Sequence, residues 1–278
     1  MNGIIDVGGG LRGIYGAGVL DYCIDYGINF DYHIGVSAGS ANLASFIAGQ
    51  KGRNISFYCE YPSRIEDMSL YNFMKSGSYI NLDYIYGELS NTDGENPLDY
   101  STMKAAKKPF IIVAMNALTG GVKYFTMKDD MQQDEYDPLK ASSCVPVVNK
   151  PYVIDKIPYY DGGMVDPIPL KKAFEDGCDK LVVILTRPKN YYRNSKKDRM
   201  FSRLIEHEYP QAAKTMRHRA EIYNTQLDLA KHYEAEGKVL IISPDDIGNL
   251  GTLTKDQKTL ESLYEKGYKD AEAIKKFL

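Results

Sequence analysis

The sequence predicts an α/β protein with a mostly parallel central sheet flanked by helices. Nearly continuous apolar runs at 110–117 and 181–185 are typical of strands that are buried on both faces of a parallel sheet. Two N-terminal runs, 3–7 and 32–34, are each followed by a glycine-containing turn and a helix-like stretch. The 278 residues, 44% hydrophobic and 26% charged, suffice for one large domain of this class.

The first unit joins a strand at 3–7 to a helix at 14–26 through the turn Gly8-Gly9-Gly10-Leu11-Arg12-Gly13. Three successive glycines can fold their N–H groups toward one anionic atom. The spacing of Gly8, Gly10 and Gly13 also satisfies the dinucleotide-binding pattern, which requires an acidic residue about 20 positions later at the end of the second strand. Asp31 is near that distance but precedes the second apolar run. Both interpretations of the turn are open at this point.

The second unit presents a serine on a sharp turn. Gly35-Val36-Ser37-Ala38-Gly39 follows the run at 32–34 and precedes the helix-like stretch 40–48. A serine on a strand-to-helix turn takes strained backbone angles, and Gly35 and Gly39 let neighbouring segments approach it. The new helix directs free N–H groups at the serine. This motif is a weak signal alone, but together with the glycine turn it describes a nucleophile facing an oxyanion hole.

The stretch 53–100 mixes aromatic and polar residues, which predicts short helices and loops over the top of the sheet, with a surface loop at 91–97. Its tyrosines and methionines could line a pocket for an apolar chain, but core packing is the commoner role of such residues. After the strand at 110–117, the turn 118–121 leads into a second strand at 122–126, as in a hairpin.

An aspartate ends the next pair of strands. Runs at 153–155 and 157–160 lead into Asp161-Gly162-Gly163. Gly162 and Gly163 give the backbone the freedom to place the carboxylate close to another segment. An isolated Asp-Gly-Gly is more often only a turn. The interpretation of Asp161 as a functional residue therefore depends on the two earlier motifs.

The composition changes after the strand at 181–185. Residues 187–203 carry seven basic side chains and one acid among aromatic residues. They could meet phospholipid headgroups or an anionic substrate, although a solvated charged surface is the commoner interpretation. A long helix at 210–236, a late strand at 239–242 and an amphipathic helix at 255–276 follow. We therefore divide the chain into a catalytic domain, 1–187, and a mainly helical region with one late strand, 188–278, packed on it.

Charge and targeting signals narrow the classes of partner and compartment. The net charge of −3 gives no overall attraction to nucleic acid. The four cysteines lack metal-type spacing and are expected to be reduced and buried. No leader-like segment or long apolar run is present, so we expect a cytoplasmic protein.

Taken in order, the glycine turn, the serine elbow and Asp161-Gly162-Gly163 resemble the signature of the patatin-like phospholipase family. The flanking residues 141–146 and 166–169 are also similar, so the resemblance covers roughly 3–187. It implies a three-layer α/β/α fold and a serine hydrolase of lipid acyl esters that works with a Ser-Asp dyad. Ser37 would be the nucleophile and Asp161 its base.

The resemblance also implies that Gly8, Gly9 and Gly10 supply the oxyanion hole, with Arg12 at the family's basic position, shaping that loop. Gly35, Gly39, Gly162 and Gly163 would support the site, and neither metal nor cofactor is required. The sequence places His207, His218 and His232 in charged helical stretches and His33 within a strand, so none is expected to complete a triad.

Two other functions stay open. The first is a member of the same fold that binds lipid or a partner without turnover, using the aromatic and basic segments. The second is a dinucleotide-binding oxidoreductase that uses the turn Gly8 to Gly13, which would leave Ser37 and Asp161 without roles. A lipid or other acyl-ester substrate is the expected ligand, with peripheral membrane contact through 187–203 as a further possibility. The sequence does not fix the oligomeric state.

Overall fold

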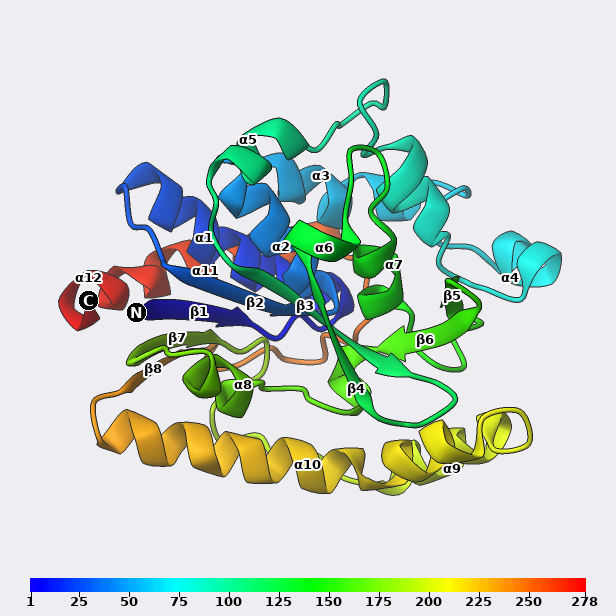
Figure 1. Ribbon diagram of the computed structural model, residues 1–278. Helices are drawn as coiled ribbons and strands as arrows, with labels where there is room; N and C mark the ends of the chain where they lie inside the picture. The colour runs from blue at the N-terminus through cyan, green and yellow to red at the C-terminus, as the bar shows by residue number, and fades with distance from the viewer.

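The computed structural model describes residues 1–278 and has three layers, a central sheet between two layers of helices (Figure 1). The strand order is β5-β6-β3-β2-β1-β7-β8, and β4 pairs with β3 beside this path. The strands are β1 (Asn2–Asp6), β2 (Tyr32–Val36), β3 (Phe110–Asn116), β4 (Val122–Thr126), β5 (Tyr152–Ile154), β6 (Ile157–Asp161), β7 (Lys180–Ile184) and β8 (Val239–Ile242).

The sheet is parallel from β3 to β8 and antiparallel where β4, β5 and β6 join it. The parallel strands are the apolar runs of the sequence, and each is buried along nearly its whole length. Adjacent side chains of β1 point to opposite faces of the sheet. Ile4 therefore belongs to the larger of two apolar cores and Ile5 to the smaller one. The expected mostly parallel, three-layer α/β/α sheet is confirmed.

Helices cover both faces of the sheet, as Figure 1 shows. The larger core joins one face to helices from the first half of the chain and from its end, and the smaller core joins the other face to α8 and α10. The longer helices are α1 (Ile14–Asp25), α2 (Ala38–Ile47), α3 (Arg53–Cys59), α4 (Leu70–Ser76), α5 (Tyr100–Ala105), α7 (Asp137–Ser143), α8 (Leu170–Glu175), α9 (Lys196–Ile205), α10 (Pro210–Ala235) and α11 (Gln257–Asp270). Shorter helical segments are η1 (Gly10–Gly13), η2 (Tyr61–Ser63), η3 (Tyr84–Glu88), α6 (Met127–Asp130), η4 (Gly162–Met164), η5 (Ala271–Ala273) and α12 (Ile274–Phe277).

The region after residue 187 shares the sheet and core with the rest of the chain. Strand β8 pairs in parallel with β7, and α11 packs along α1. The two helices approach so closely that a Cβ on Gly18 would lie 2.1 Å from the Tyr264 carbonyl oxygen, and one on Gly267 would lie 2.1 Å from that of Tyr15. The expected late strand and the amphipathic helix are both present, and the helix ends in the short turns η5 and α12.

The stretch 53–100 folds as short helices and loops, as expected, but core packing is the wrong interpretation for α4. Leu70, Tyr71, Phe73 and Met74 are 72%, 55%, 46% and 79% exposed. Residues of the same stretch outside α4 do reach the core, among them Tyr58 and Leu82. This stretch therefore divides between a buried part and a solvent-facing apolar helix.

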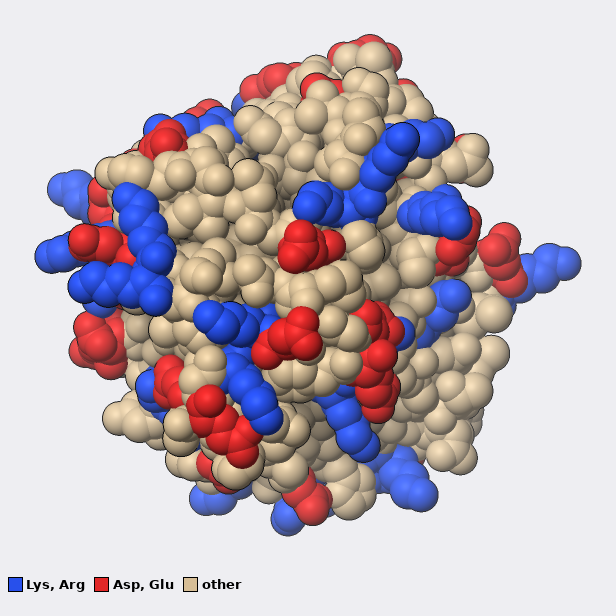
Figure 2. Space-filling view, turned by 60° about the vertical axis from the view of Figure 1, so that its left-hand side comes forward, with Lys and Arg blue, Asp and Glu red and all other residues tan.

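Charges on the face that includes the chain termini are mixed. Figure 2, in which the left-hand side of Figure 1 comes forward, shows Lys and Arg side chains interspersed with Asp and Glu. This face offers no extended patch of one sign. None of the helices combines the length and the apolar character needed to cross a bilayer.

Candidate active site

Ser37 stands between β2 and α2 in a strained conformation. Its φ of 57° and ψ of −136° lie outside the regions that a serine adopts without cost. The residue is 7% exposed and lines a cavity. Its backbone N–H is directed away from the cavity, because it donates to Oγ of Ser142 at 2.8 Å. The sharp turn that the sequence predicted is therefore present, with the nucleophile candidate at its apex.

Ser142 holds this elbow in place. Its hydroxyl accepts from the Ser37 N–H and donates to the Val113 carbonyl oxygen at 2.6 Å, linking α7 to β2 and β3. The hydroxyl of Ser40 lies 3.2 Å from that of Ser142. The sequence analysis missed this role, because only the resemblance of the segment 141–146 drew attention to Ser142 at all.

Asp161 ends β6 and is 4% exposed. Its Oδ1 accepts from the Gly163 N–H at 2.7 Å, which fixes the carboxylate. Burial raises the pKa of Asp161, while the Ser37 hydroxyl and then the charge of Arg219 act in the opposite direction. Ser37 thus lies close enough to act on the carboxylate, although the pair does not have the geometry of a fully formed hydrogen bond, as is common in nucleophile and base pairs before substrate binds.

The glycine turn packs directly against the serine elbow. A Cβ on Gly8 would lie 2.4 Å from the Val36 carbonyl oxygen, and Gly8 has a φ of 63°, so only glycine fits there. The Gly8 N–H donates to Oδ1 of Asp6 at 2.9 Å and so cannot serve an oxyanion. The N–H groups of Gly9 and Gly10 carry no such bond. The structure therefore narrows the expected donors from three glycines to two.

A buried polar network behind the turn explains why Gly8 differs. Asp6 is fully buried, and its Oδ2 accepts from Asn42 Nδ2 at 2.9 Å. Asn42 also donates to the Gly13 carbonyl oxygen and accepts from the Tyr58 hydroxyl, each at 2.8 Å. Burial raises the pKa of Asp6 to about 6. Nothing in the local pattern around Asp6 signalled this network, which joins residues far apart in the sequence.

The supporting glycines lie where backbones meet closely. A Cβ on Gly39 would be 2.2 Å from the Asp6 carbonyl oxygen, and one on Gly162 would be 2.3 Å from that of Val113. Gly35 would meet the Ser40 backbone at 2.5 Å. Gly163 instead donates to Asp161 and accepts from Arg219 Nε at 2.7 Å. The turn, the elbow and the aspartate loop are therefore packed into one unit.

Arg12 is buried beneath the glycine turn. Its Nη1 donates to Thr252 Oγ1 at 3.0 Å, and its Nε has no partner. Burial, and after it the charge of Arg187, lowers the pKa of Arg12 to about 10. The Leu11 N–H also donates to the Thr252 carbonyl oxygen, at 2.9 Å. The loop that carries Thr252 thus covers the turn, a contact that the sequence did not suggest.

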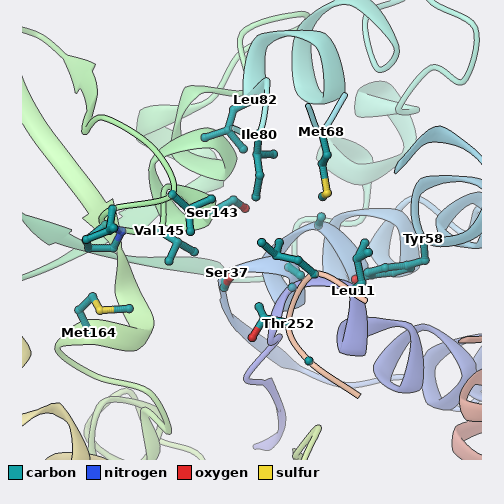
Figure 3. Close-up of a pocket in the computed structure, with 18 of the residues that line it drawn as sticks. Leu11, Ser37, Tyr58, Met68, Ile80, Leu82, Ser143, Val145, Met164 and Thr252 are labelled. Atoms are coloured by element: carbon teal, nitrogen blue, oxygen red, sulfur yellow. The ribbon is translucent and has the colours of Figure 1, made fainter. Parts of the chain in front are cut away.

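The cavity beside Ser37 has a volume of about 810 Å³, and 18 of its 34 lining residues are hydrophobic. In Figure 3, Met68, Ile80 and Leu82 lie together on one side of Ser37, with Met164 and Thr252 on the other. Part of the stretch 53–100 therefore lines a pocket as well as packing in the core. An apolar chain fits such a lining.

The dinucleotide interpretation of the turn is not supported by the position of Asp31. Asp31 precedes β2 and accepts from the Asn2 N–H at 3.0 Å, which places it at the amino end of the strands. The glycine turn follows β1 and lies at the carboxyl end. Asp31 therefore cannot reach a ribose bound at the turn.

Histidines do not contribute to the site. His33 is buried in β2, its Nδ1 lies 3.3 Å from the Pro109 carbonyl oxygen, and burial lowers its pKa to about 4. His207, His218 and His232 are exposed on or near α10. No group of three or more His, Cys, Asp or Glu side chains is arranged to hold a metal ion. The titratable group that acts on Ser37 in this structure is thus the Asp161 carboxylate and not a histidine.

Comparisons with known proteins identify the family of the chain. The sequence profile of the patatin-like phospholipase family matches residues 7–174, and that of a domain of unknown function, DUF6363, matches residues 209–277. The uncharacterized protein YjjU of Escherichia coli K12 is 34% identical over 190 residues, covering 66% of this chain and 52% of YjjU. The chain thus spans about half the length of this relative.

The crystal structure of VipD from Legionella pneumophila has a similar fold. The TM-score is 0.52 at 16% sequence identity, and the match covers 98% of this chain and 66% of VipD. The fold, the ordered motifs and a profile match over more than half of the chain lead to one conclusion: this chain belongs to the patatin-like phospholipase family, a family of lipid acyl hydrolases.

Proposed function

We propose that this protein is a serine acyl hydrolase in which Ser37 is the nucleophile and Asp161 the general base. The observation that carries the proposal is a strained serine on the wall of an apolar cavity, with the uncommitted N–H group of Gly10 on the same wall and the buried Asp161 carboxylate beside the serine. A buried carboxylate with a raised pKa is a better base than an exposed one, because it holds a proton more strongly.

In this mechanism Ser37 Oγ attacks the ester carbonyl carbon while Asp161 accepts the hydroxyl proton. The N–H groups of Gly9, Gly10 and Ala38, the first residue of α2, stabilise the oxyanion that forms. The alcohol leaves with the proton from Asp161, and an acyl-enzyme remains. Water then attacks the acyl carbon and gives a proton to Asp161. As the fatty acid leaves, Asp161 returns this proton to Ser37 Oγ, which restores both residues.

The substrate class follows from the cavity. An ester with an apolar acyl chain would place that chain among Met68, Ile80 and Leu82 while its carbonyl meets Ser37. Burying a chain of several methylenes in this lining contributes about 0.8 kcal/mol for each one. Lipid esters are therefore the substrates that the cavity favours.

We further propose that substrate is taken from a lipid surface. Two segments with exposed apolar side chains adjoin residues that line the cavity: α4, which follows the lining residue Met68, and α9, which contains the lining residue Phe201. On α9, Met200 and Leu204 are 54% and 67% exposed. Figure 1 shows both helices at the right-hand end of the molecule. On α9 the apolar pair lies among basic residues that suit an anionic bilayer, Lys196, Lys197, Arg199 and Arg203.

The test is labelling of the purified protein with a fluorophosphonate probe, read by intact mass. We expect one adduct on the wild type and none on Ser37→Ala. Ser143→Ala is the matched control, because Ser143 lines the same cavity and bonds only the Tyr86 hydroxyl, at 3.0 Å. This control should label like the wild type.

Equal labelling of Ser37→Ala would overturn the assignment of the nucleophile. A wild type that binds lipid but never labels and hydrolyses no ester would favour the alternative, a member of the family that binds without turnover. The free N–H groups of Gly9 and Gly10 support turnover instead, since a binding protein has no need of uncommitted donors beside a strained serine.

A further inference from the structure

The charged residues that line the cavity are almost all basic. Asp198 is the one acid among them, against six cations. The six are Arg53, Arg187, Arg193, Lys196, Lys197 and Arg219. All but Arg53 come from the part of the chain between 187 and 219, beyond the match to the family profile, which ends at residue 174. The cavity therefore has a cationic end that the family motifs did not predict.

Two of these cations are fully used by the fold. The Arg53 guanidinium donates to the hydroxyls of Ser45 and Ser90 and to two backbone carbonyl oxygens. Arg193 forms a bidentate ion pair with Asp198, at 2.8 Å and 2.7 Å. Asp198 is 1% exposed, so this pair is a structural element of the wall.

Arg187 is different, because its guanidinium makes no hydrogen bond or ion pair within the chain. It lies 4.2 Å from the ring centre of Tyr191, which in turn contacts Tyr223 edge to face. Stacking on an aromatic ring orients a guanidinium group and leaves its N–H groups free to donate hydrogen bonds. Arg187 is thus oriented at the cavity wall and has no counter-ion there.

Arg219 joins this cationic end to the catalytic pair. Its Nε donates to the Gly163 carbonyl oxygen, and its Nη1 lies 3.7 Å from Asp198, a carboxylate already taken by Arg193. Burial, and then the charge of Arg193, lowers the pKa of Arg219 to about 10. The Asp198 carboxylate thus lies between Arg193 and Arg219, while the two Nη groups of Arg219 donate no hydrogen bond within the chain.

We propose that Arg187 and Arg219 form a subsite for the phosphate group of an acyl-ester substrate, with Arg193 adding its positive charge, so that the region after residue 187 selects phosphate-bearing lipids. The proposal rests on the proposed function for the cleavage of that substrate, but binding alone can test it. Guanidinium groups match the oxygens of a phosphate with paired hydrogen bonds. The apolar lining would hold the acyl chain on one side of Ser37 and the arginines the headgroup on the other.

The first experiment compares two monomeric esters with the same acyl chain, a 1-acylglycerol 3-phosphate and a monoacylglycerol. In Arg187→Gln we expect kcat/KM for the phosphate-bearing ester to fall about 10- to 100-fold, mainly through KM. For the monoacylglycerol we expect a change of about twofold at most. Arg187→Lys should restore part of the preference, because it keeps the charge but loses the fork of donors. Lys214→Gln, an exposed cation of α10 outside the cavity, is the matched control and should behave as wild type.

The second experiment measures binding by calorimetry to Ser37→Ala protein, with and without Arg187→Gln. We expect the acylglycerol phosphate to bind about 10-fold more weakly to the double variant, and the monoacylglycerol to bind equally to both. This result would support the subsite even if no ester were hydrolysed, so failure of the proposed function would be seen separately. Thermal unfolding of each variant checks that the fold is intact.

Three outcomes would overturn the subsite. One is an equal loss of kcat/KM for both esters in Arg187→Gln, and another is a wild type without preference for the phosphate-bearing ester. The third distinguishes the source of the phosphate: inorganic phosphate or glycerol 3-phosphate binding as tightly as the acylated ligand would assign the arginines to a free anion instead of a lipid headgroup.

Discussion

Ser37 and Asp161 each cost the fold free energy where they stand. A non-glycine residue with a φ of 57° is strained, and a carboxylate that is 4% exposed has lost most of its hydration. The contacts of Ser142, Gly39 and Gly162, which hold the surrounding segments together, offset both of these free-energy costs. Such local costs are typical of catalytic sites, where activity and stability make opposing demands.

Asp161→Asn should abolish ester hydrolysis without lowering the melting temperature at pH 7. Asparagine can still accept the Gly163 hydrogen bond, but it cannot take a proton from Ser37. Because the pKa of Asp161 is raised in the folded protein, ionisation of this group disfavours the fold, and the penalty grows as pH rises from the unfolded value, about 3.9, through the raised value. The melting temperature of the wild type should therefore rise relative to that of the variant as pH falls.

Thermal unfolding scans between pH 4 and pH 8, about the range over which an aspartate with a raised pKa titrates, measure this difference. Ester hydrolysis by the same samples measures turnover. A variant that keeps wild-type turnover would remove Asp161 from the mechanism. A variant that melts lower than the wild type at pH 7 would mean that the carboxylate stabilises the fold.

Single residues show where prediction from sequence stops. Ser37, Asp161 and the glycines could be named because each lies in a short local pattern. Asp6 could not, because its role comes from Asn42 and Tyr58, which only the folded sheet brings to it. The same contact removes Gly8 from the oxyanion donors. Local patterns thus locate the reacting groups but not the network that orients them.

At the scale of elements, the buried strands and the long helices were predictable to within a few residues. Their signal is an apolar run or a helical stripe that faces a core, as in β3, β7 and α10. Helices α4 and α9 were not predicted individually, because several of their apolar side chains face solvent, among them Met74, Met200 and Leu204. The basic segment 187–203 is also not merely a solvated surface, since Arg187, Arg193 and Lys197 line the cavity.

The two exposed apolar residues of α9, Met200 and Leu204, provide a test of the proposed lipid contact. Met200→Asp combined with Leu204→Asp should reduce co-sedimentation with vesicles that contain phosphatidylglycerol by at least about 10-fold, because two apolar side chains no longer enter the bilayer. Added salt should weaken binding of the wild type through screening of its lysines and arginines. Hydrolysis of a monomeric ester should be unchanged, since neither residue lines the cavity.

Tyr26→Ser is the matched control, because Tyr26 is 54% exposed after α1, at the amino end of the strands. It should bind vesicles like the wild type. Equal binding by the double variant would show that α9 does not carry the contact. Binding to zwitterionic and anionic vesicles alike would show that the basic residues contribute nothing to it.

The whole molecule depends on its last third in two ways. The region after residue 187 completes the sheet with β8, and it covers α1 with α11. It also provides the cationic end of the cavity and the cover of the glycine turn. The sequence indicated a packed C-terminal region, but only the sheet order shows how the two parts are joined.

A chain that ends at residue 187 should therefore fail to fold as a unit. It would leave the outer edge of β7 unpaired and the apolar surface of α1 open to water. Circular dichroism during thermal unfolding, together with probe labelling, should show no cooperative transition and no adduct. A fragment that melts cooperatively and labels at Ser37 would establish 1–187 as an autonomous catalytic domain.

The contact between Arg12 and Thr252 joins residues 240 positions apart in the chain. On the ribosome, the strand and turn that carry Arg12 are therefore made long before the residue that covers them. A nascent chain consequently carries Ser37 throughout this interval without that cover. Under the proposed function, translation itself postpones hydrolysis until Thr252 has been made.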